Sequence, residues 1–168
     1  MSAEEWVDIV DLADEVVTSV PRNEMRAGGM LHRAASILVS RSDGEVYVHR
    51  RTETKDVHPG MYDVFVGGVV ASGETYDDTA IRELGEELGV TVAEPRSLFR
   101  YLYRGEPGAC WTAVYELTWD GDVRPQAEEI AWGAFVPWGE LAGMLVTLPF
   151  CPDSREIVLR GWGDRIGA

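Results

Sequence analysis

Residues 68–90 read GVVASGETYDDTAIRELGEELGV, and this stretch decides how the chain is expected to fold. Thr75 followed by Asp78 forms a capping-box pattern that starts a helix, and Gly89 stands where a helix ends. We therefore predict a helix over residues 75–88. Its apolar positions share one face that can bury against a sheet, namely Ala80, Ile81, Leu84 and Leu88.

Three glutamates of this helix, Glu83, Glu86 and Glu87, project together because residues three and four apart share a helix face. Crowded carboxylates repel one another, and a divalent cation such as magnesium or manganese relieves that repulsion. Arg82 can reach Glu86 one turn away and help to hold it. A solvated acidic helix face has the same spacing, so the glutamates alone leave both interpretations open.

The whole stretch matches the Nudix box, G-x5-E-x7-R-E-U-x-E-E-x-G-U with U aliphatic, at every fixed position. The chain therefore resembles the Nudix superfamily. This resemblance implies the α/β (α+β) class, specifically an α/β/α sandwich with a mixed β-sheet, in which the box forms a loop, a helix and a second loop. We expect a single domain over residues 1–168.

The resemblance also implies roles for the residues of the box. Magnesium, with manganese as a substitute, is expected on one backbone carbonyl and three carboxylates: Gly67, Glu83, Glu86 and Glu87. Arg82 is expected to orient a box glutamate, and Glu74 to tie the loop to the helix. The implied reaction is attack of water at phosphorus in a small-molecule diphosphate.

A glutamate takes the proton of the attacking water in this scheme. Glu83 is one candidate for this role. Many Nudix proteins use a glutamate outside the box, and Glu128 and Glu129 stand just before an expected strand. We favour Glu129, while a solvated pair of loop residues is an equally weighted alternative.

The rest of the chain predicts many strands and few helices in mixed order, which favours a mixed sheet. The turn Ser42-Asp43-Gly44 predicts a hairpin, and a polar segment at 22–29 predicts a loop or a short helical turn. Asp153 is a candidate N-cap of the last helix. Strands are expected over 6–12, 15–20, 34–40, 45–51, 64–70, 96–104, 110–119 and 130–136, and closing helices over 137–145 and 153–162.

A second resemblance lies upstream of the box, to the Nudix branch related to isopentenyl-diphosphate isomerase. Its residues are Leu31-His32-Arg33-Ala34-Ala35-Ser36, Val48-His49-Arg50-Arg51, Lys55-Asp56 and Pro59-Gly60-Met61-Tyr62-Asp63. The isomerases need a cysteine in the strand that leads into the box, but Val64-Phe65-Val66-Gly67-Gly68 holds none. The resemblance therefore implies an isomerase-like hydrolase without isomerase activity.

Four basic residues near the loop that faces the box are candidates for contact with phosphate oxygens. Arg50, Arg51 and Lys55 are the predicted substrate-binding residues, and Arg33 belongs to the same upstream motif. Surface salt bridges are the plainer interpretation of each of them.

The composition limits the partners of the chain. Its 168 residues carry a formal net charge of −14, which disfavours nucleic acid and anionic membranes as partners. Two distant cysteines disfavour a disulfide framework and a structural zinc site, and the N-terminus has no signal-peptide pattern. We expect a cytoplasmic protein, and the resemblance implies a homodimer as one option.

Two further functions remain open at this point. A catalytically idle Nudix domain would sense a nucleotide or bind a partner, but such domains often lose box glutamates that this chain keeps. The isomerase reaction is the other alternative, and the missing cysteine disfavours it.

Overall fold

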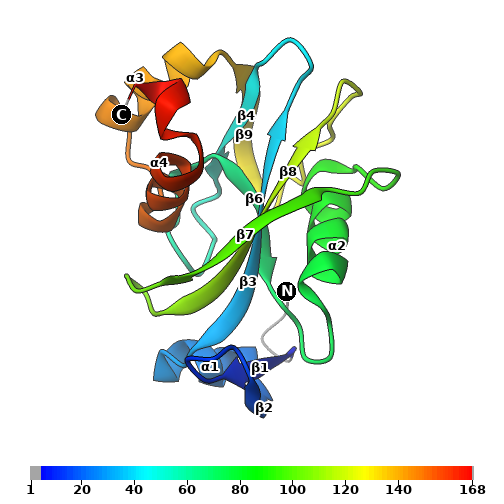
Figure 1. The fold of residues 1–168 in the computed structure, drawn as a ribbon, viewed down its shortest axis with the longest axis vertical. Coiled ribbons are helices and arrows are strands. Elements are labelled where there is room, and N and C mark those ends of the chain that lie inside the picture. The colour runs from blue at the N-terminus through cyan, green and yellow to red at the C-terminus, as the bar shows by residue number, and fades with distance from the viewer. Residues whose placement is uncertain (1–4, 168) are drawn as a thin grey trace.

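The computed structural model describes residues 5–167, in which runs of strands are separated by single helices and two helices close the chain (Figure 1). In chain order they are β1 (Trp6–Val10), β2 (Val16–Pro21), α1 (Arg22–Gly28), β3 (His32–Ser40), β4 (Val46–Arg51), β5 (Tyr62–Asp63), β6 (Phe65–Val69), α2 (Tyr76–Leu88), β7 (Arg96–Tyr103), β8 (Cys110–Thr118), β9 (Ile130–Val136), α3 (Trp138–Thr147) and α4 (Pro152–Ile166). Every strand and helix expected from the sequence is present, and the segment at 22–29 forms the short helix α1.

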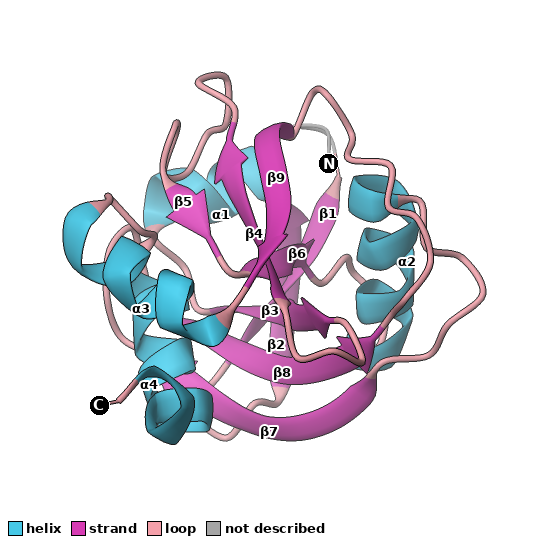
Figure 2. Cartoon of the chain, turned by 90° about the horizontal axis from the view of Figure 1, so that it is seen from above, coloured by secondary structure: helices cyan, strands magenta, loops and turns pink. Residues whose placement is uncertain are grey.

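The central sheet is mixed, as predicted, and β3 is its middle strand (Figure 2). β3 pairs in parallel with β8 over its full length and antiparallel with β6 on its other side. β4 pairs antiparallel with β9 and with β5. The predicted hairpin between β3 and β4 is correct only at its turn, because the two strands pair at Ser40 and Val46 and then separate. Their separation makes room for β6 beside β3.

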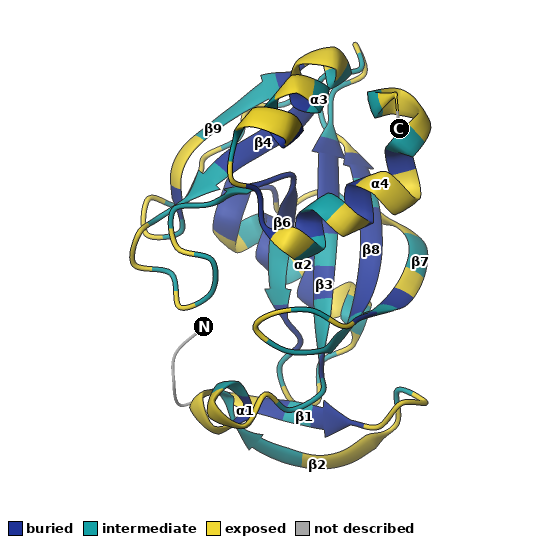
Figure 3. Cartoon of the chain, turned by 90° about the vertical axis from the view of Figure 1, so that its left-hand side faces the viewer, coloured by how far each residue is buried: buried dark blue, intermediate teal, exposed yellow. Residues whose placement is uncertain are grey.

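Helices cover both faces of the sheet, with α2 on one side and α3 and α4 on the other (Figures 1 and 3). Alternate residues of β3 point to opposite faces, as the two-residue period of a strand requires. Ile37 packs in the core under α2 with Leu84, whereas Leu38 packs in the core under α4 with Ile157. This arrangement confirms the predicted α/β/α sandwich.

The first two strands form a small sheet of their own beside the end of β3 that carries His32 (Figure 1). A small apolar cluster holds α1 against this sheet, and it contains Met25, Val7 and Ile9. Backbone hydrogen bonds from Val10 to the Leu31 carbonyl and from Ser72 to the Trp6 carbonyl fasten the unit to β3 and to the loop before α2. The orientation of α1 is thereby set.

The ends of α2 follow the sequence prediction. The Thr75 side chain accepts a hydrogen bond from the Asp78 amide, the Asp78 carboxylate accepts from the Thr75 amide, and Gly89 ends the helix with φ +70°. The prediction for α4 was wrong at its start. Cys151 is the N-cap and Pro152 the first helical residue, so Asp153 lies inside the first turn.

No helix within residues 5–167 is long and apolar enough to span a membrane.

Candidate active site

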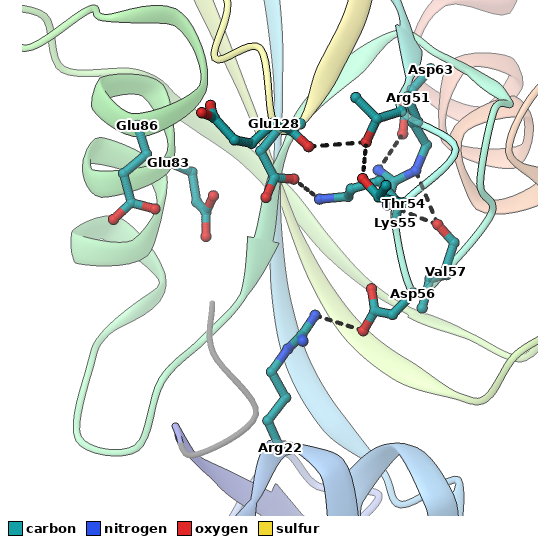
Figure 4. A network of polar contacts seen from close by, with 12 residues as sticks. Arg22, Arg51, Thr54, Lys55, Asp56, Val57, Asp63, Glu83, Glu86 and Glu128 are labelled. Carbon is teal, nitrogen blue, oxygen red and sulfur yellow. Dashed lines mark hydrogen bonds and ion pairs between the residues drawn. The ribbon is translucent and has the colours of Figure 1, made fainter.

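The box glutamates lie on the face of α2 that borders a cleft, and they differ in exposure. Glu83 and Glu87 are each 5% exposed, while the side chain of Glu86 is 48% exposed. All three line the cleft. Figure 4 shows Glu83 and Glu86 side by side on α2, with Lys55 and Arg51 on the opposite side of the view. The predicted common face is therefore present.

Arg82 connects these carboxylates to the loop before the helix. Its Nη1 atom lies 2.8 Å from Glu83 Oε1 and 3.2 Å from Glu86 Oε2. Its other nitrogens contact both carboxylate oxygens of Glu74, at 2.9 and 3.1 Å. Glu74 also accepts hydrogen bonds from the Thr79 hydroxyl and the Ala71 amide. Arg82 and Glu74 thus occupy the positions that the resemblance assigned to orienting and structural residues.

Two adjacent glycines let β6 approach both β3 and the helix. Gly67 has φ +151°, and a Cβ atom there would lie 2.0 Å from the Ala35 carbonyl oxygen. A Cβ atom on Gly68 would lie 2.4 Å from Glu83 Oε1. The carboxylate of Glu83 therefore occupies space that a side chain at position 68 would take.

The donor set fits a hard divalent cation. Glu87 makes no side-chain hydrogen bond or ion pair within the described chain, and burial together with the nearby Glu83 raises its pKa to about 8. Burial also raises the pKa of Glu83, although Arg82 opposes this effect. Within residues 5–167 no three acidic, histidine or cysteine side chains already surround one point, and Arg82 contacts both Glu83 and Glu86 in this structure. A bound cation would replace the proton that this raised pKa keeps on Glu87, and hard cations favour carboxylate oxygens as ligands.

The opposite wall of the cleft comes from the loop after β4 and the segment before β9. Lys55 forms an ion pair with Glu129, 74 residues away in the chain. Arg51 donates two hydrogen bonds to the Val57 carbonyl, at 2.9 and 3.1 Å, and its Nη1 atom lies 4.0 Å from Asp63 Oδ2. Arg51, Lys55 and Glu129 line the same cleft as the box glutamates.

Other basic candidates lie elsewhere. Arg50 donates to the Gly60 carbonyl and pairs with Glu53, and it is not among the lining residues of the cleft. Arg33 pairs with Asp14 in the turn between β1 and β2. Arg50 therefore forms the surface salt bridge of the plainer interpretation, whereas the pair of Arg33 with Asp14 is largely buried, with 20% and 10% of the side chains exposed. Glu128 contributes its backbone carbonyl to the Thr52 hydroxyl.

Sequence reasoning missed Arg22 and Arg26, which bring α1 into the wall of the cleft. Their spacing of four residues would place them on one helix face, but their segment was interpreted as a loop or a single turn. His32 also lines the cleft; its burial lowers its pKa to about 4, so its ring is neutral at pH 7.

A mixed-sheet sandwich whose box helix presents glutamates to a cleft defines the Nudix class of proteins. The comparison with protein families agrees, because the NUDIX domain matches residues 30–160, and this chain belongs to the Nudix family. A Nudix hydrolase of Streptomyces coelicolor is 47% identical over 170 residues, covering 99% of this chain and 94% of that protein. One of Pseudomonas aeruginosa is 42% identical over 153 residues, covering 90% of each chain. The prediction of an enzyme of the Nudix hydrolase type is confirmed.

Solved structures with the same fold include a protein of Deinococcus radiodurans, with a TM-score of 0.81 and 28% identity, covering 94% of this chain and 99% of that one. The Nudix domain of Shewanella oneidensis NrtR, solved with ADP ribose, has a TM-score of 0.60 and 16% identity, covering 80% and 86%. The second likeness concerns the fold alone.

Proposed function

We propose that this chain hydrolyses a diphosphate linkage in a nucleoside di- or triphosphate, or in another nucleoside-diphosphate-linked compound, with magnesium as its metal. One observation carries the proposal: the cleft has buried carboxylates on one wall and cationic side chains on the other. Glu83 and Glu87 face Arg51 and Lys55 across it. A diphosphate has the charge to bridge such walls when a cation stands on the acidic side.

The metal would be held by Glu83, Glu86, Glu87 and the carbonyl of Gly67, and manganese is an expected substitute. A bound cation of this kind neutralises phosphate charge and lowers the pKa of a water molecule. The protein keeps Glu87 free of other partners along the described chain, which leaves its carboxylate available.

The remaining residues position the reactants. Arg82 orients Glu83 and Glu86, and Lys55 and Arg51 offer N–H donors to the phosphate oxygens. The oxygen of water forms a bond to phosphorus while the bond from that phosphorus to the bridging oxygen breaks. The leaving phosphate departs with the bridging oxygen. We propose that Glu129 accepts the proton of the water, with Glu83 as the alternative base. Arg50 would need to leave Glu53 to reach the substrate.

We further propose that the chain is an isomerase-like Nudix hydrolase that does not isomerise. The strand β6 supports this proposal, since it carries no cysteine. Cys110 lines the cleft from β8, but burial raises the pKa of its thiol to about 11, so it is neutral at pH 7. A single domain, a cytoplasmic location and a homodimer stay predictions.

The test is a panel of nucleoside di- and triphosphates, sugar nucleotides, dinucleotides and isopentenyl diphosphate, assayed with and without magnesium. Phosphate release is read directly and after added pyrophosphatase or phosphatase. Release that requires magnesium, and that is lost in Glu87→Gln but kept in the exposed control Glu94→Gln, supports the hydrolase. Ligand-induced thermal stabilisation without release from any compound would instead support the idle sensing domain.

A further inference from the structure

Two arginines on α1 form a cationic corner of the cleft that the box does not account for. Arg22 and Arg26 lie one turn apart, with 17% and 27% of their side chains exposed. Both line the cleft that also holds the box glutamates. Figure 4 shows Arg22 extending from α1 toward Asp56, with Lys55 above both residues in this view.

The corner carries more positive charge than Asp56, its one ion-pair partner among residues 5–167, can neutralise. A single oxygen, Asp56 Oδ2, lies 2.9 Å from Arg22 Nη2 and 3.6 Å from Arg26 Nε. The Nε atoms of both arginines are buried without a hydrogen-bond partner in the described structure. Within residues 5–167, two guanidiniums that share one carboxylate oxygen therefore leave one positive charge and two buried Nε–H donors unmatched.

Two neighbouring guanidiniums that are largely buried repel each other and lose contact with water, so their arrangement is unfavourable without a counter-ion. Burial and the neighbouring Arg22 lower the pKa of Arg26, while Asp56 raises it. Removing unpaired cations from water is costly unless an anion compensates them. Asp56 is itself 43% exposed at its side chain and belongs to the loop between β4 and β5, so an incoming anion can replace it.

We propose that Arg22 and Arg26 form a second anion subsite, which receives a further phosphoryl group of the substrate beyond the hydrolysed diphosphate. This inference rests on the proposed function for the place of the diphosphate. Asp56 is the counter-ion of the two arginines until the phosphoryl group displaces it. The guanidiniums then donate hydrogen bonds to the oxygens of the phosphoryl group. The preferred substrates are therefore compounds with at least three phosphoryl groups, such as nucleoside triphosphates, over the matching diphosphates.

The direct test is calorimetric titration of inorganic tripolyphosphate into the metal-free protein. Arg22→Gln and Arg26→Gln are each expected to weaken binding about tenfold or more. Asp56→Asn is expected to tighten it, a gain that misfolding cannot produce. The matched control Arg96→Gln removes an arginine that is 71% exposed on β7 and paired with Glu116, and should bind as the wild type does. Equal affinity in wild type, Arg22→Gln and Arg26→Gln overturns the proposal, as does an absence of binding to the wild type.

Turnover separates this inference from the proposed function. The wild type should favour a nucleoside triphosphate over the diphosphate in kcat/KM, and Arg26→Gln should lower kcat/KM for the triphosphate more than for the diphosphate, which removes that preference. If the enzyme turns over substrate but its preference for the triphosphate does not depend on these arginines, the subsite is contradicted and the proposed hydrolase function is retained. If tripolyphosphate binding depends on the arginines but no compound is turned over, the anion subsite is supported and the proposed hydrolase function is contradicted.

Discussion

Arg82 and Glu74 form a two-pronged ion pair, with Nε 2.9 Å from Oε1 and Nη2 3.1 Å from Oε2. The third nitrogen of the same guanidinium, Nη1, contacts Glu83 and Glu86. One side chain therefore ties the loop before α2 to the helix and also fixes two of the carboxylates proposed to hold magnesium. A planar guanidinium can do this, whereas an ammonium cannot reproduce the fork.

Arg82→Lys should reduce kcat/KM by about 10- to 100-fold and the free energy of unfolding by about 1 kcal/mol. Steady-state kinetics on the best substrate of the panel and urea unfolding measure the two effects. The control Arg96→Lys alters an exposed pair on β7 and should change neither. Full activity in Arg82→Lys would mean that the fork does not position the glutamates.

Glu87→Gln should stabilise the metal-free protein while abolishing magnesium-dependent turnover. The wild-type carboxyl group is buried beside Glu83 without a partner in the described chain, so without metal it must bind a proton at neutral pH or carry a buried charge, and the amide avoids both costs. We expect a gain of about 1 kcal/mol or more in the free energy of unfolding without metal. Saturating magnesium should stabilise the wild type but not the variant. A variant less stable than the metal-free wild type would contradict the burial of an unpaired charge.

Gly68→Ala should impair metal binding without unfolding the protein. The added Cβ atom would meet Glu83 Oε1 at 2.4 Å, and the carboxylate would have to move. We expect the magnesium concentration for half-maximal activity to rise about tenfold, as for a displaced ligand. The control Gly143→Ala adds a methyl group in α3 where the surroundings of the helix leave open space. An unchanged magnesium requirement in Gly68→Ala would show that Glu83 does not bind the metal.

Local patterns could be predicted because local physics determines them. The capping box of Thr75 and Asp78 starts α2 as expected, and the three-to-four spacing places Glu83 and Glu87 on one face. The two-residue period of a strand also predicts that Arg50 and Arg51 point to opposite sides of the sheet. It does not predict which side borders the cleft, and in the structure Arg51 is the residue that lines it.

The parts of the fold and of the site that the sequence did not predict depend on long-range packing. Arg22 and Arg26 reach the cleft because Met25 and the first two strands fix the orientation of α1, and no local pattern encodes that docking. The separation of β3 from β4 depends on β6 and β9 competing for their edges. The hairpin signal at Ser42-Asp43-Gly44 predicted the turn but could not predict this competition.

His49 should make the fold sensitive to acid. Its ring is fully buried, burial lowers its pKa to about 3, and its Nδ1 atom has no partner in the described structure. The unfolded chain, with a histidine pKa of 6.5, binds the proton first, so stability falls as pH drops below that value. From pH 7.5 to 5 the wild type should lose about 2 kcal/mol more than His49→Phe. Urea unfolding at both pH values measures this difference, and equal losses would contradict a neutral buried ring.

The proton acceptor can be identified from the pair formed by Lys55 and Glu129. If Glu129 takes the proton of water, Glu129→Gln should lower kcat by about 10²- to 10⁴-fold with little change in KM. If Glu129 only holds Lys55 in place, both Glu129→Gln and Lys55→Met should act on KM instead, and the double variant should be no worse than either. The control Glu128→Gln changes a neighbour whose backbone carbonyl makes its contact, to Thr52, and should stay within about twofold of the wild type.

The position of Glu83 makes it the weaker candidate for the base. Its Oε1 atom is held by Arg82 and lies against Gly68, and magnesium would claim the same carboxylate. Glu129 stands on the opposite wall, where its carboxylate is 23% exposed and pairs with the Lys55 ammonium. A loss of less than about threefold in kcat for Glu129→Gln would be too small for a general base and would transfer the role to Glu83.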